Sequence, residues 1–348
     1  MSGVLLPTAF HVRTAEHNPG NAWLRRGAYT LPAHFGDPHY EALAARFSSV
    51  LADVSSLEDM RVEGVGADSL LAAACGPGAR TLGVGHVRAV HWSAEGGGLR
   101  GVGTLLRDAE NAFVLRSPDA DIGWFAPHAP RFDASIRDAT AERGLLLLAG
   151  PFAPAVFAAA GLEQAAAFEP DELIRQDWNG IPVALSREPR LNATLIACGV
   201  EDGVIVFDRL LRAGKPLGLR LAGQQAVELL QLEAGIALPN LDFKPARANV
   251  AREPLPVSLG LLPPNGKAQA LTGVEFDCDD AHPFAPLFHE GVEAGHTLRS
   301  AYSPALRRAI ALAQIEPKYA APGTLLRLGE TKNADSEVNA RVVLLPFL

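Results

Sequence analysis

Residues 27–64 read GAYTLPAHFGDPHYEALAARFSSVLADVSSLEDMRVEG and carry the first strong helix signal of the chain. Asp37 is a favourable residue for capping the start of a helix, and Pro38 suits the first helical position. Apolar residues then recur at helical spacing, at Tyr40, Leu43, Phe47, Val50 and Leu51. We therefore expect a helix over 37–54 that buries this face.

Gly, Pro and Asp residues mark the ends of further predicted strands and helices. Short apolar or alternating runs bounded by these residues predict strands, over 87–92, 104–107, 113–115, 144–150, 181–185, 204–207 and 342–347. Helices are expected over 67–74, 153–160 and 222–234 and from Ser303-Pro304 onward, with a connector over 237–257. Helices and strands mix without regular alternation, which favours an α+β fold over a doubly wound sheet.

Length and composition limit the class of protein. The chain has 348 residues, of which 48% are apolar, so it can bury a substantial core, and its length suggests two or three domains. The net charge of −8, without a Lys/Arg stripe, argues against a nucleic-acid partner. The N-terminal sequence does not resemble a signal peptide, and no apolar run is long enough to span a membrane. Three widely separated cysteines fit a reducing compartment, so a cytoplasmic protein is expected.

Common catalytic motifs are missing. The sequence contains no G-x-G-x-x-G loop after a strand, no Walker loop, no H-E-x-x-H and no G-x-S-x-G. Asp277, Asp279, Asp280 and His282 form an acidic cluster that is more typical of a solvated loop than of a metal site. No metal site is therefore predicted, and motifs alone identify no chemistry.

Six short blocks nevertheless occur in an informative order. The first is 27–64, with Tyr29, Pro32, Arg46, Asp53-x-Ser55 and Gly64. The others are AEGGGLRGVGTLL (94–106), LLLLAGPFAPAVF (145–157), PVALSRE (182–188), LLQLEAGIALPNLDF (229–243) and AYSPALRRAIALAQI (301–315), the last followed by Gly323-Thr324 and VVLLPF. In this order the chain resembles a divergent member of the aminomethyltransferase superfamily. That superfamily includes the glycine cleavage T-protein and the tetrahydrofolate-dependent demethylases.

The resemblance implies a fold and a cofactor. The expected architecture is a T-protein-like folate-binding fold of class α+β, with antiparallel sheets and packed helices around a central channel. Residues 1–245 would form this core from two intertwined subdomains, and residues 246–348 would form a small β-barrel-like domain. The implied cofactor is tetrahydrofolate, folded into the channel as the acceptor of a one-carbon unit.

The chain departs from the superfamily pattern at three places. Members that transfer an aminomethyl group carry an acidic pair after the Gly-Gly turn, where this chain has Leu99-Arg100. A guanidinium stays protonated and cannot shuttle a proton, so glycine-cleavage chemistry is not expected. The Ser-Arg-x-Gly-Tyr-x-Gly-Glu block keeps only Ser186-Arg187, and Ala226-Val227-Glu228 replaces an Ala-Arg-Asp that would face the acidic tail of folate.

The resemblance also implies candidate site residues in three roles. Tyr29 and His91 are the candidate catalytic acids; Glu233, Trp92, Arg187 and Leu57 are candidates for cofactor binding; Arg116 and Arg100 are candidates for substrate binding. Several have structural alternatives. Glu233 would equally serve as a buried carboxylate that holds loop amides, Arg116 as an exposed arginine at a strand end, and Trp92 and Tyr29 as packing residues.

Two functions of different classes fit these observations. The first is a tetrahydrofolate-dependent one-carbon (methyl) transferase that acts as an O- or N-demethylase on a small molecule, either a methoxylated aromatic acid or a small methylated metabolite. The alternative is a catalytically degenerate folate-fold protein that serves as a maturation factor or as a subunit of a larger oxidase or demethylase complex. The Lys-Gly-Cys-x-Gly-Gln type of motif found in the maturation branch is absent. A homo-oligomer or a partner subunit that completes the site remains open.

Overall fold

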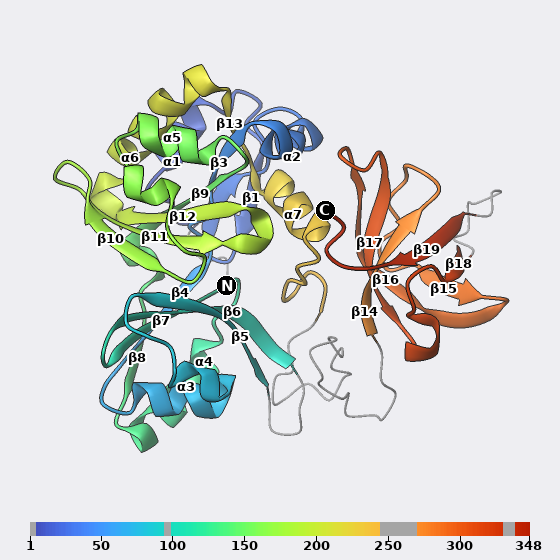
Figure 1. Cartoon of the computed structure of the whole chain (residues 1–348), viewed down its shortest axis with the longest axis horizontal. Helices are drawn as coiled ribbons and strands as arrows, with labels where there is room; N and C mark the ends of the chain where they lie inside the picture. The colour runs from blue at the N-terminus through green and yellow to red at the C-terminus, as the bar shows by residue number, and fades with distance from the viewer. Residues whose placement is uncertain (1–4, 94–98, 244–269, 330–337) are drawn as a thin grey trace. The chain divides into compact units, whose positions relative to one another are not determined.

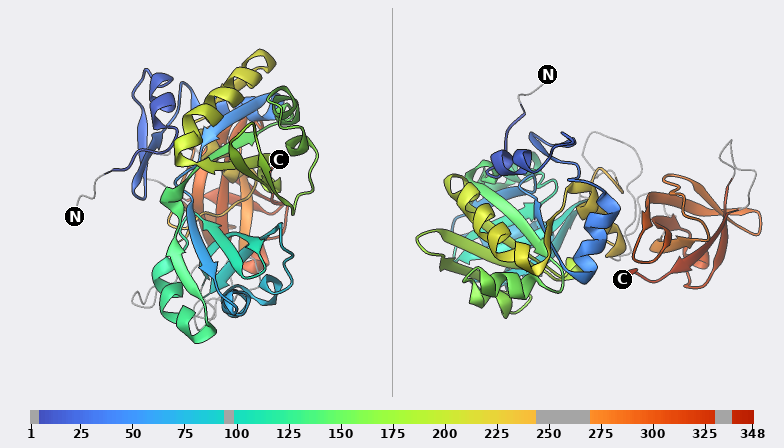
Figure 2. Two further views of the ribbon diagram at one scale, coloured as in Figure 1. Left: turned by 90° about the vertical axis from the view of Figure 1, so that its left-hand side faces the viewer. Right: turned by 90° about the horizontal axis from the view of Figure 1, so that it is seen from above.

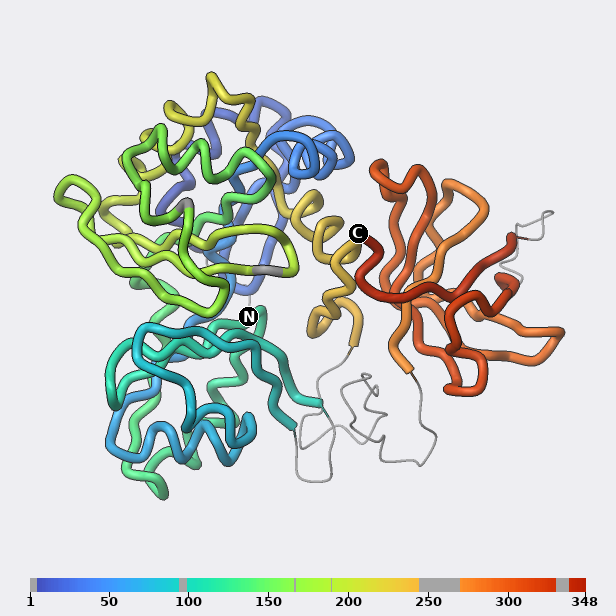
Figure 3. Tube along the Cα trace, viewed as in Figure 1, coloured from blue at the N-terminus to red at the C-terminus, as the bar shows by residue number. Residues whose placement is uncertain are grey.

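The computed structural model describes residues 5–93, 99–243, 270–329 and 338–348, and its elements are labelled in Figure 1. The chain divides into two compact units. The first runs to Val90 and continues over Val102–Glu228; the second consists of His91–Gly101 and Leu229–Leu348. Figure 3 follows the Cα trace through both. The predicted domain boundary at 245/246 lies outside the described residues.

A six-stranded sheet is the centre of the first unit. Its strand order is β10 (Leu173–Asp177), β11 (Pro182–Glu188), β12 (Ala193–Gly199), β9 (Arg143–Ala149), β3 (Ser49–Asp53) and β13 (Leu219–Leu221). Neighbouring strands are antiparallel, except that β13 runs parallel to β3. The predicted strand over 144–150 is confirmed as β9, whose apolar run is fully buried because it lies in the interior of the sheet.

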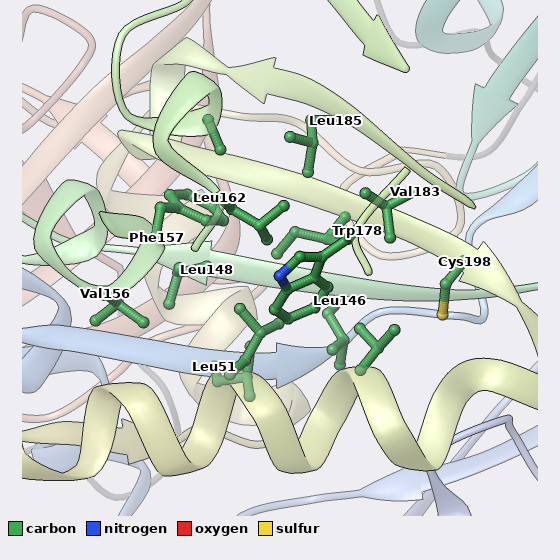
Figure 4. Packing of buried hydrophobic residues seen from close by; sticks show 14 of the residues in the cluster. Leu51, Leu146, Leu148, Val156, Phe157, Leu162, Trp178, Val183, Leu185 and Cys198 are labelled. Carbon is green, nitrogen blue, oxygen red and sulfur yellow. The ribbon is translucent and has the colours of Figure 1, made fainter. Parts of the chain in front are cut away.

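Helices α5 (Ala153–Ala159) and α6 (Gly203–Gly214) pack against one face of this sheet, as Figure 2 shows from two further sides. Their apolar residues join those of β3, β9, β11 and β12 in one core cluster. Trp178 lies inside this cluster, among Leu146, Leu162 and Val183 (Figure 4). Its indole N–H donates to the carbonyl oxygen of Ala160 at 2.9 Å, which satisfies the buried donor.

A five-stranded antiparallel sheet forms the other layer. The strand order is β5 (His86–Ser93), β6 (Leu99–Ala109), β7 (Ala112–Ser117), β4 (Glu58–Glu63) and β8 (Ser135–Asp138). The predicted strands over 87–92, 104–107 and 113–115 are confirmed within β5, β6 and β7. The remaining small elements of the first unit are α1 (His11–Glu16), β1 (Trp23–Arg26), β2 (Tyr29–Pro32), α3 (Ala67–Cys75) and α4 (Ile122–Phe125).

The helix predicted over 37–54 is in fact a helix followed by a strand. Helix α2 covers Pro38–Phe47, and the carboxylate of Asp37 accepts the backbone N–H of His39 at 2.9 Å, as expected for the cap. Strand β3 begins at Ser49, so Val50 and Leu51 are buried in a sheet and do not extend the helix. Pairing of β3 with β9 on one side and β13 on the other overrides the helical periodicity of 50–51.

The predicted buried face of α2 is also wrong. Tyr40 and Phe47 are exposed, whereas Glu41 is buried. The carboxylate of Glu41 accepts the backbone N–H groups of Phe35, Gly36 and Gly223 at 2.7–2.9 Å. These three hydrogen bonds compensate the burial of its charge, so the helix turns an acidic residue inward.

Residues 204–207, predicted as a strand, belong to helix α6. Val206, Phe207 and Leu210 are its buried residues at helical spacing, and the four-residue run VIVF is too short to separate the two periods. The helix predicted over 222–234 is confirmed as α7 (Gln224–Glu233), with Gly235 at φ +67° just beyond its end. No described helix is long and apolar enough to cross a membrane.

The second unit contains the predicted barrel-like domain as a closed barrel. Its strands follow the order β14 (Ala270–Phe276), β17 (Arg308–Ile315), β16 (Val292–Ser303), β15 (Pro286–His289), β18 (Leu325–Leu328) and β19 (Asn339–Val343). The expected closing strand over 342–347 is only partly confirmed, because β19 ends at Val343. The helix predicted from Ser303-Pro304 is wrong: Ser303 ends β16, and residues 304–307 form the turn to β17.

Candidate functional site

The eight predicted site residues are divided between the two compact units. The first unit holds Tyr29, Leu57, Arg116 and Arg187; the second holds His91, Trp92, Arg100 and Glu233.

The first group centres on a carboxylate that the sequence did not single out, Asp59 on β4. Asp59 lies directly opposite Arg116 on β7, and the guanidinium of Arg116 binds it through two hydrogen bonds of 2.8 Å, from Nε and Nη2. Arg143, at the start of β9 in the other sheet, donates its Nε to Asp59 Oδ2 at 2.7 Å. All three side chains are more than nine-tenths buried. This Asp59 cluster, consisting of Asp59, Arg116 and Arg143, therefore ties the two sheets together.

Burial and charge act in opposite directions on these groups. Burial alone would raise the pKa of the Asp59 carboxyl, but the guanidinium groups of Arg116 and Arg143 outweigh it and hold that pKa well below its usual range. Burial likewise tends to lower the pKa of Arg116, and the charge and hydrogen bonds of Asp59 reverse this and raise it. Asp59 is thus ionised throughout the physiological range, and the Asp59 cluster carries a net positive charge.

Arg143 also brings Leu57 into this region. Its Nη2 donates to the carbonyl oxygen of Leu57 at 2.6 Å, and its Nη1 donates to that of Ser55 at 3.3 Å. The backbone N–H of Ser55 in turn donates to the carboxylate of Asp53 at 3.0 Å. The loop between β3 and β4 is therefore held by a hydrogen-bonded path that leads to Asp59.

Tyr29 lies on β2, and of the residues of the Asp59 cluster only Arg143 acts on it electrostatically. Burial raises the pKa of its phenol, and the negative charges of Asp138 and Glu58 add to the increase, while Arg143 opposes them. The phenol is therefore neutral at physiological pH and retains a proton that it can donate. Hydrogen bonds thus connect Leu57 and Arg116 through Arg143 and Asp59, whereas Tyr29 is related to this group only through the charge of Arg143.

Arg187 stands apart from the Asp59 cluster, on β11. Its Nη1 donates to the hydroxyl of Thr194 at 3.2 Å, and its guanidinium lies 4.5 Å from the ring centroid of Phe168. Burial lowers the pKa of this arginine, and no described carboxylate compensates its charge. A partly buried cation in this state favours an anionic ligand. The described residues contain no cluster of three His, Cys, Asp or Glu side chains suited to a metal ion.

In the second unit, Glu233 ends helix α7 and is almost fully buried, with 1% of its surface exposed. The Ser303 hydroxyl donates to its Oε1 at 2.6 Å, and the backbone N–H of Phe347 donates to its carbonyl oxygen at 2.8 Å. These contacts attach the end of α7 to the last residue of β16 and to the C-terminal segment. Only the contact with Ser303 uses the carboxylate of Glu233; the contact with Phe347 uses its backbone.

Trp92 and Arg100, on β5 and β6, are both buried. A Cβ atom added at Gly101 would lie 2.2 Å from Cζ2 of Trp92, so the indole packs directly on the Gly101 backbone. None of the surface of Trp92 is exposed in this structure. His91, one residue earlier on β5, is only partly buried.

Two residues of the Asp59 cluster carry no clear sequence signal, and Arg116 lies elsewhere than the sequence predicts. Asp59 and Arg143 flank apolar runs, where charged residues are ordinarily solvent-exposed. The sequence places Arg116 after its strand, with an exposed strand end as the alternative, whereas it lies within β7 and is buried. In the alternating stretch 58–63, Asp59 lies on the face opposite to Met60 and Val62, so the pattern gives no signal for its burial.

Two family models match the chain. Residues 10–250 match the GCVT N-terminal domain, and residues 269–348 match the glycine cleavage T-protein C-terminal barrel domain. Together these matches cover both the two-sheet region and the barrel.

Individual proteins give the same result. An aminomethyltransferase of Bacillus cereus (strain 03BB102) is 27% identical over 346 residues, which cover 92% of each chain. An aminomethyltransferase of Bacillus mycoides (strain KBAB4) is 27% identical over 344 residues, with the same coverage. The crystal structure of the glycine cleavage system aminomethyltransferase T from Bartonella henselae has a TM-score of 0.84 at 21% identity, covering 99% of this chain and 98% of that one. The similarity to that structure shows a shared fold.

Proposed function

The chain belongs to the folate-dependent glycine cleavage T-protein family, and on this basis we propose that it is a tetrahydrofolate-dependent methyltransferase acting as an O- or N-demethylase on a small anionic aromatic compound. One observation supports demethylation over aminomethyl transfer: Arg100, a buried cation, stands where aminomethyl-transferring members are expected to have a carboxylate. An arginine cannot relay the proton that aminomethyl transfer requires, but its charge can hold an anionic substrate.

The residues of the first unit fit a folate with an acidic tail. Arg187 offers a partly buried guanidinium that no described carboxylate neutralises, and this suits the carboxylates of that tail. Leu57 has its backbone fixed by Arg143, which makes it a pre-positioned apolar contact. When bound, tetrahydrofolate supplies the nitrogen that accepts the methyl group. In this proposal Glu233 contributes by fixing the end of α7.

Tyr29 is the proposed general acid. Removal of a methyl group from oxygen or nitrogen leaves an anion that must gain a proton, and a neutral phenol can donate one. The raised pKa of Tyr29 keeps this proton available at neutral pH. His91 is the second candidate for the same step, and Arg116 and Arg100 are the proposed cationic contacts for the substrate.

Calorimetric titration with tetrahydrofolate tests the cofactor assignment. We expect micromolar binding to the wild-type protein, and about tenfold weaker binding for Arg187→Ala, because a hydrogen-bonded charge contact is lost. Arg187→Lys should fall between the two. Arg190→Ala is the matched control: Arg190 lies three residues away, is exposed and is paired with Glu188. Its affinity should equal that of the wild type.

Absence of tetrahydrofolate binding at millimolar ligand would overturn the proposal. The degenerate folate-fold protein would then be the function to pursue. Equal affinities of the wild-type and Arg187→Ala proteins would remove Arg187 from the cofactor site and leave the activity itself in place.

A further inference from the structure

A cavity of about 530 Å³ lies between the two sheets of the first unit. Residues of β4, β6 and β7 line it from one sheet, and residues of β10, β11 and β12 line it from the other. We refer to it as the intersheet pocket. Of the predicted site residues in the described part of the chain, only Arg116, the proposed substrate contact, lines it, and none of the candidates for cofactor binding does.

One part of the intersheet pocket is apolar. Leu106, Val114 and Leu173 form a small buried cluster, against which Ala184 packs, and all four line the pocket. Such a surface favours the aromatic ring or short aliphatic body of a ligand. The volume is sufficient for a small organic molecule.

Two deeply buried polar side chains next to this surface retain unused hydrogen-bond donors. Arg116 is 7% exposed and uses Nε and Nη2 for Asp59, while its Nη1 has no hydrogen-bond partner among the described residues. Ser186 is 3% exposed, and its hydroxyl likewise has no partner in the described part of the chain. Neither atom is among the fully buried atoms that lack a partner, so both donors are open to a ligand or to water in the pocket.

The carboxylates of the two buried acids in the lining, by contrast, are occupied by arginines. Both oxygens of Asp59 accept from Arg116 and Arg143. Both oxygens of Asp108 accept from arginines, Oδ2 from Arg61 Nη1 at 3.1 Å and Oδ1 from Arg175 Nη2 at 2.5 Å.

The two acids at the rim are also engaged. Glu142 pairs with Arg137, and Asp177 accepts the backbone N–H of Gly180. Among the buried polar groups of the lining, the unused hydrogen-bond capacity is therefore that of the Arg116 and Ser186 donors. An acceptor with negative charge satisfies it best.

We propose that the intersheet pocket binds a small carboxylate with an aromatic or aliphatic body. The carboxylate accepts from Arg116 Nη1 and the Ser186 hydroxyl, and the apolar body lies on Leu106, Val114 and Leu173. This site shares Arg116 with the proposed contacts for the demethylase substrate, but it requires neither folate nor methyl transfer, so its test does not depend on either.

The test uses benzoate as the probe, titrated into the whole protein by calorimetry. We expect benzoate to bind at least about tenfold more tightly than benzyl alcohol, which keeps the ring and lacks the charge. Acetate, which keeps the charge and lacks the ring, should also bind more weakly. Ser186→Ala should weaken benzoate binding about five- to tenfold, and Ala184→Phe, which fills the apolar surface, should abolish it.

Arg190→Ala serves as the surface control and should leave benzoate affinity unchanged. Melting curves check that Ser186→Ala and Ala184→Phe remain folded; Ser186→Ala removes a single oxygen and keeps the proposal testable if the larger substitution does not fold. Absence of benzoate binding at millimolar concentration, equal binding of benzoate and benzyl alcohol, or unchanged affinity in Ser186→Ala would each overturn the proposal. The tetrahydrofolate titration is a separate measurement, so either proposal can fail without the other.

Discussion

Replacing Asp59 with asparagine is expected to lower the free energy of unfolding by about 3–5 kcal/mol, because it leaves two buried guanidinium groups without their counter-charge. Asp59 accepts three hydrogen bonds from Arg116 and Arg143, which belong to different sheets. The amide of asparagine keeps one oxygen acceptor and loses the charge. Urea unfolding followed by circular dichroism measures the effect.

Glu142→Gln is the matched control. Glu142 also pairs with an arginine, Arg137, but both side chains are about half exposed. Water and salt screen such a pair, so the change in unfolding free energy should stay below about 0.5 kcal/mol. The double variant Asp59→Asn/Arg116→Met should be more stable than Asp59→Asn alone, because it removes one of the two uncompensated charges. Equal stabilities of Asp59→Asn and the control would show that the Asp59 cluster does not hold the two sheets together.

The same carboxylate predicts a pH dependence of stability. The pKa of Asp59 is lowered in the folded protein, so its contribution is complete above the unfolded pKa of about 3.9 and is lost as the pH falls below it. The wild-type protein should therefore lose stability through this acidic range more steeply than Asp59→Asn. Parallel pH profiles for the two proteins would contradict this assignment.

Tyr29→Phe is expected to lower kcat by about 10²-fold, because it removes the proposed proton donor and keeps the aromatic ring. KM should change little, since the substrate contacts are assigned to Arg116 and Arg100. The assay is turnover of methoxylated aromatic acids in the presence of tetrahydrofolate. Burial, Asp138 and Glu58 raise the pKa of Tyr29, so a Tyr29-dependent rate should stay constant through neutral pH and fall only above its ordinary value near pH 10.

Tyr40→Phe provides the control for Tyr29→Phe. Tyr40 is an exposed tyrosine on α2 whose ring contacts Arg220, and its variant should retain full activity. Full turnover by Tyr29→Phe would remove Tyr29 from the acid role. The same substitution test would then apply to His91.

Errors in the predicted elements arise where local pattern and tertiary pairing disagree. The stretch 301–315 is rich in Ala and Leu, which favour helix, and its Ser-Pro start resembles a helix N-terminus. In the structure Ala309, Ala311 and Ala313 join the barrel core, and β17 is buried on both faces between β14 and β16. Small residues at alternate positions suit the inside of a narrow barrel as well as a helix. Only pairing with the neighbouring strands therefore decides that this stretch forms a strand.

Some of the residues in the candidate site could be predicted from the sequence and others could not. The order of the six blocks is enough to indicate Tyr29, Leu57 and Arg187 as positions worth testing. The pairing of Asp59 with Arg116 and Arg143 could not be predicted from the sequence. Arg116 lies 57 residues from Asp59 in the chain, and Arg143 lies 84 residues from it. The composition of the strands that carry these residues does not indicate which buried carboxylate pairs with which buried guanidinium.

The sequence by itself determined the α+β class, the order of the family blocks and the elements with a clear period, such as the buried strand β9 and the helix α7 with its glycine end. The tertiary structure alone decided that Glu41 faces inward, that 301–315 forms a hairpin, and that Asp59 joins two sheets beside a donor-rich pocket. The physical reason is that periodicity records only how burial varies along the chain. The partner that stabilises a buried charge is set by sheet pairing between distant segments.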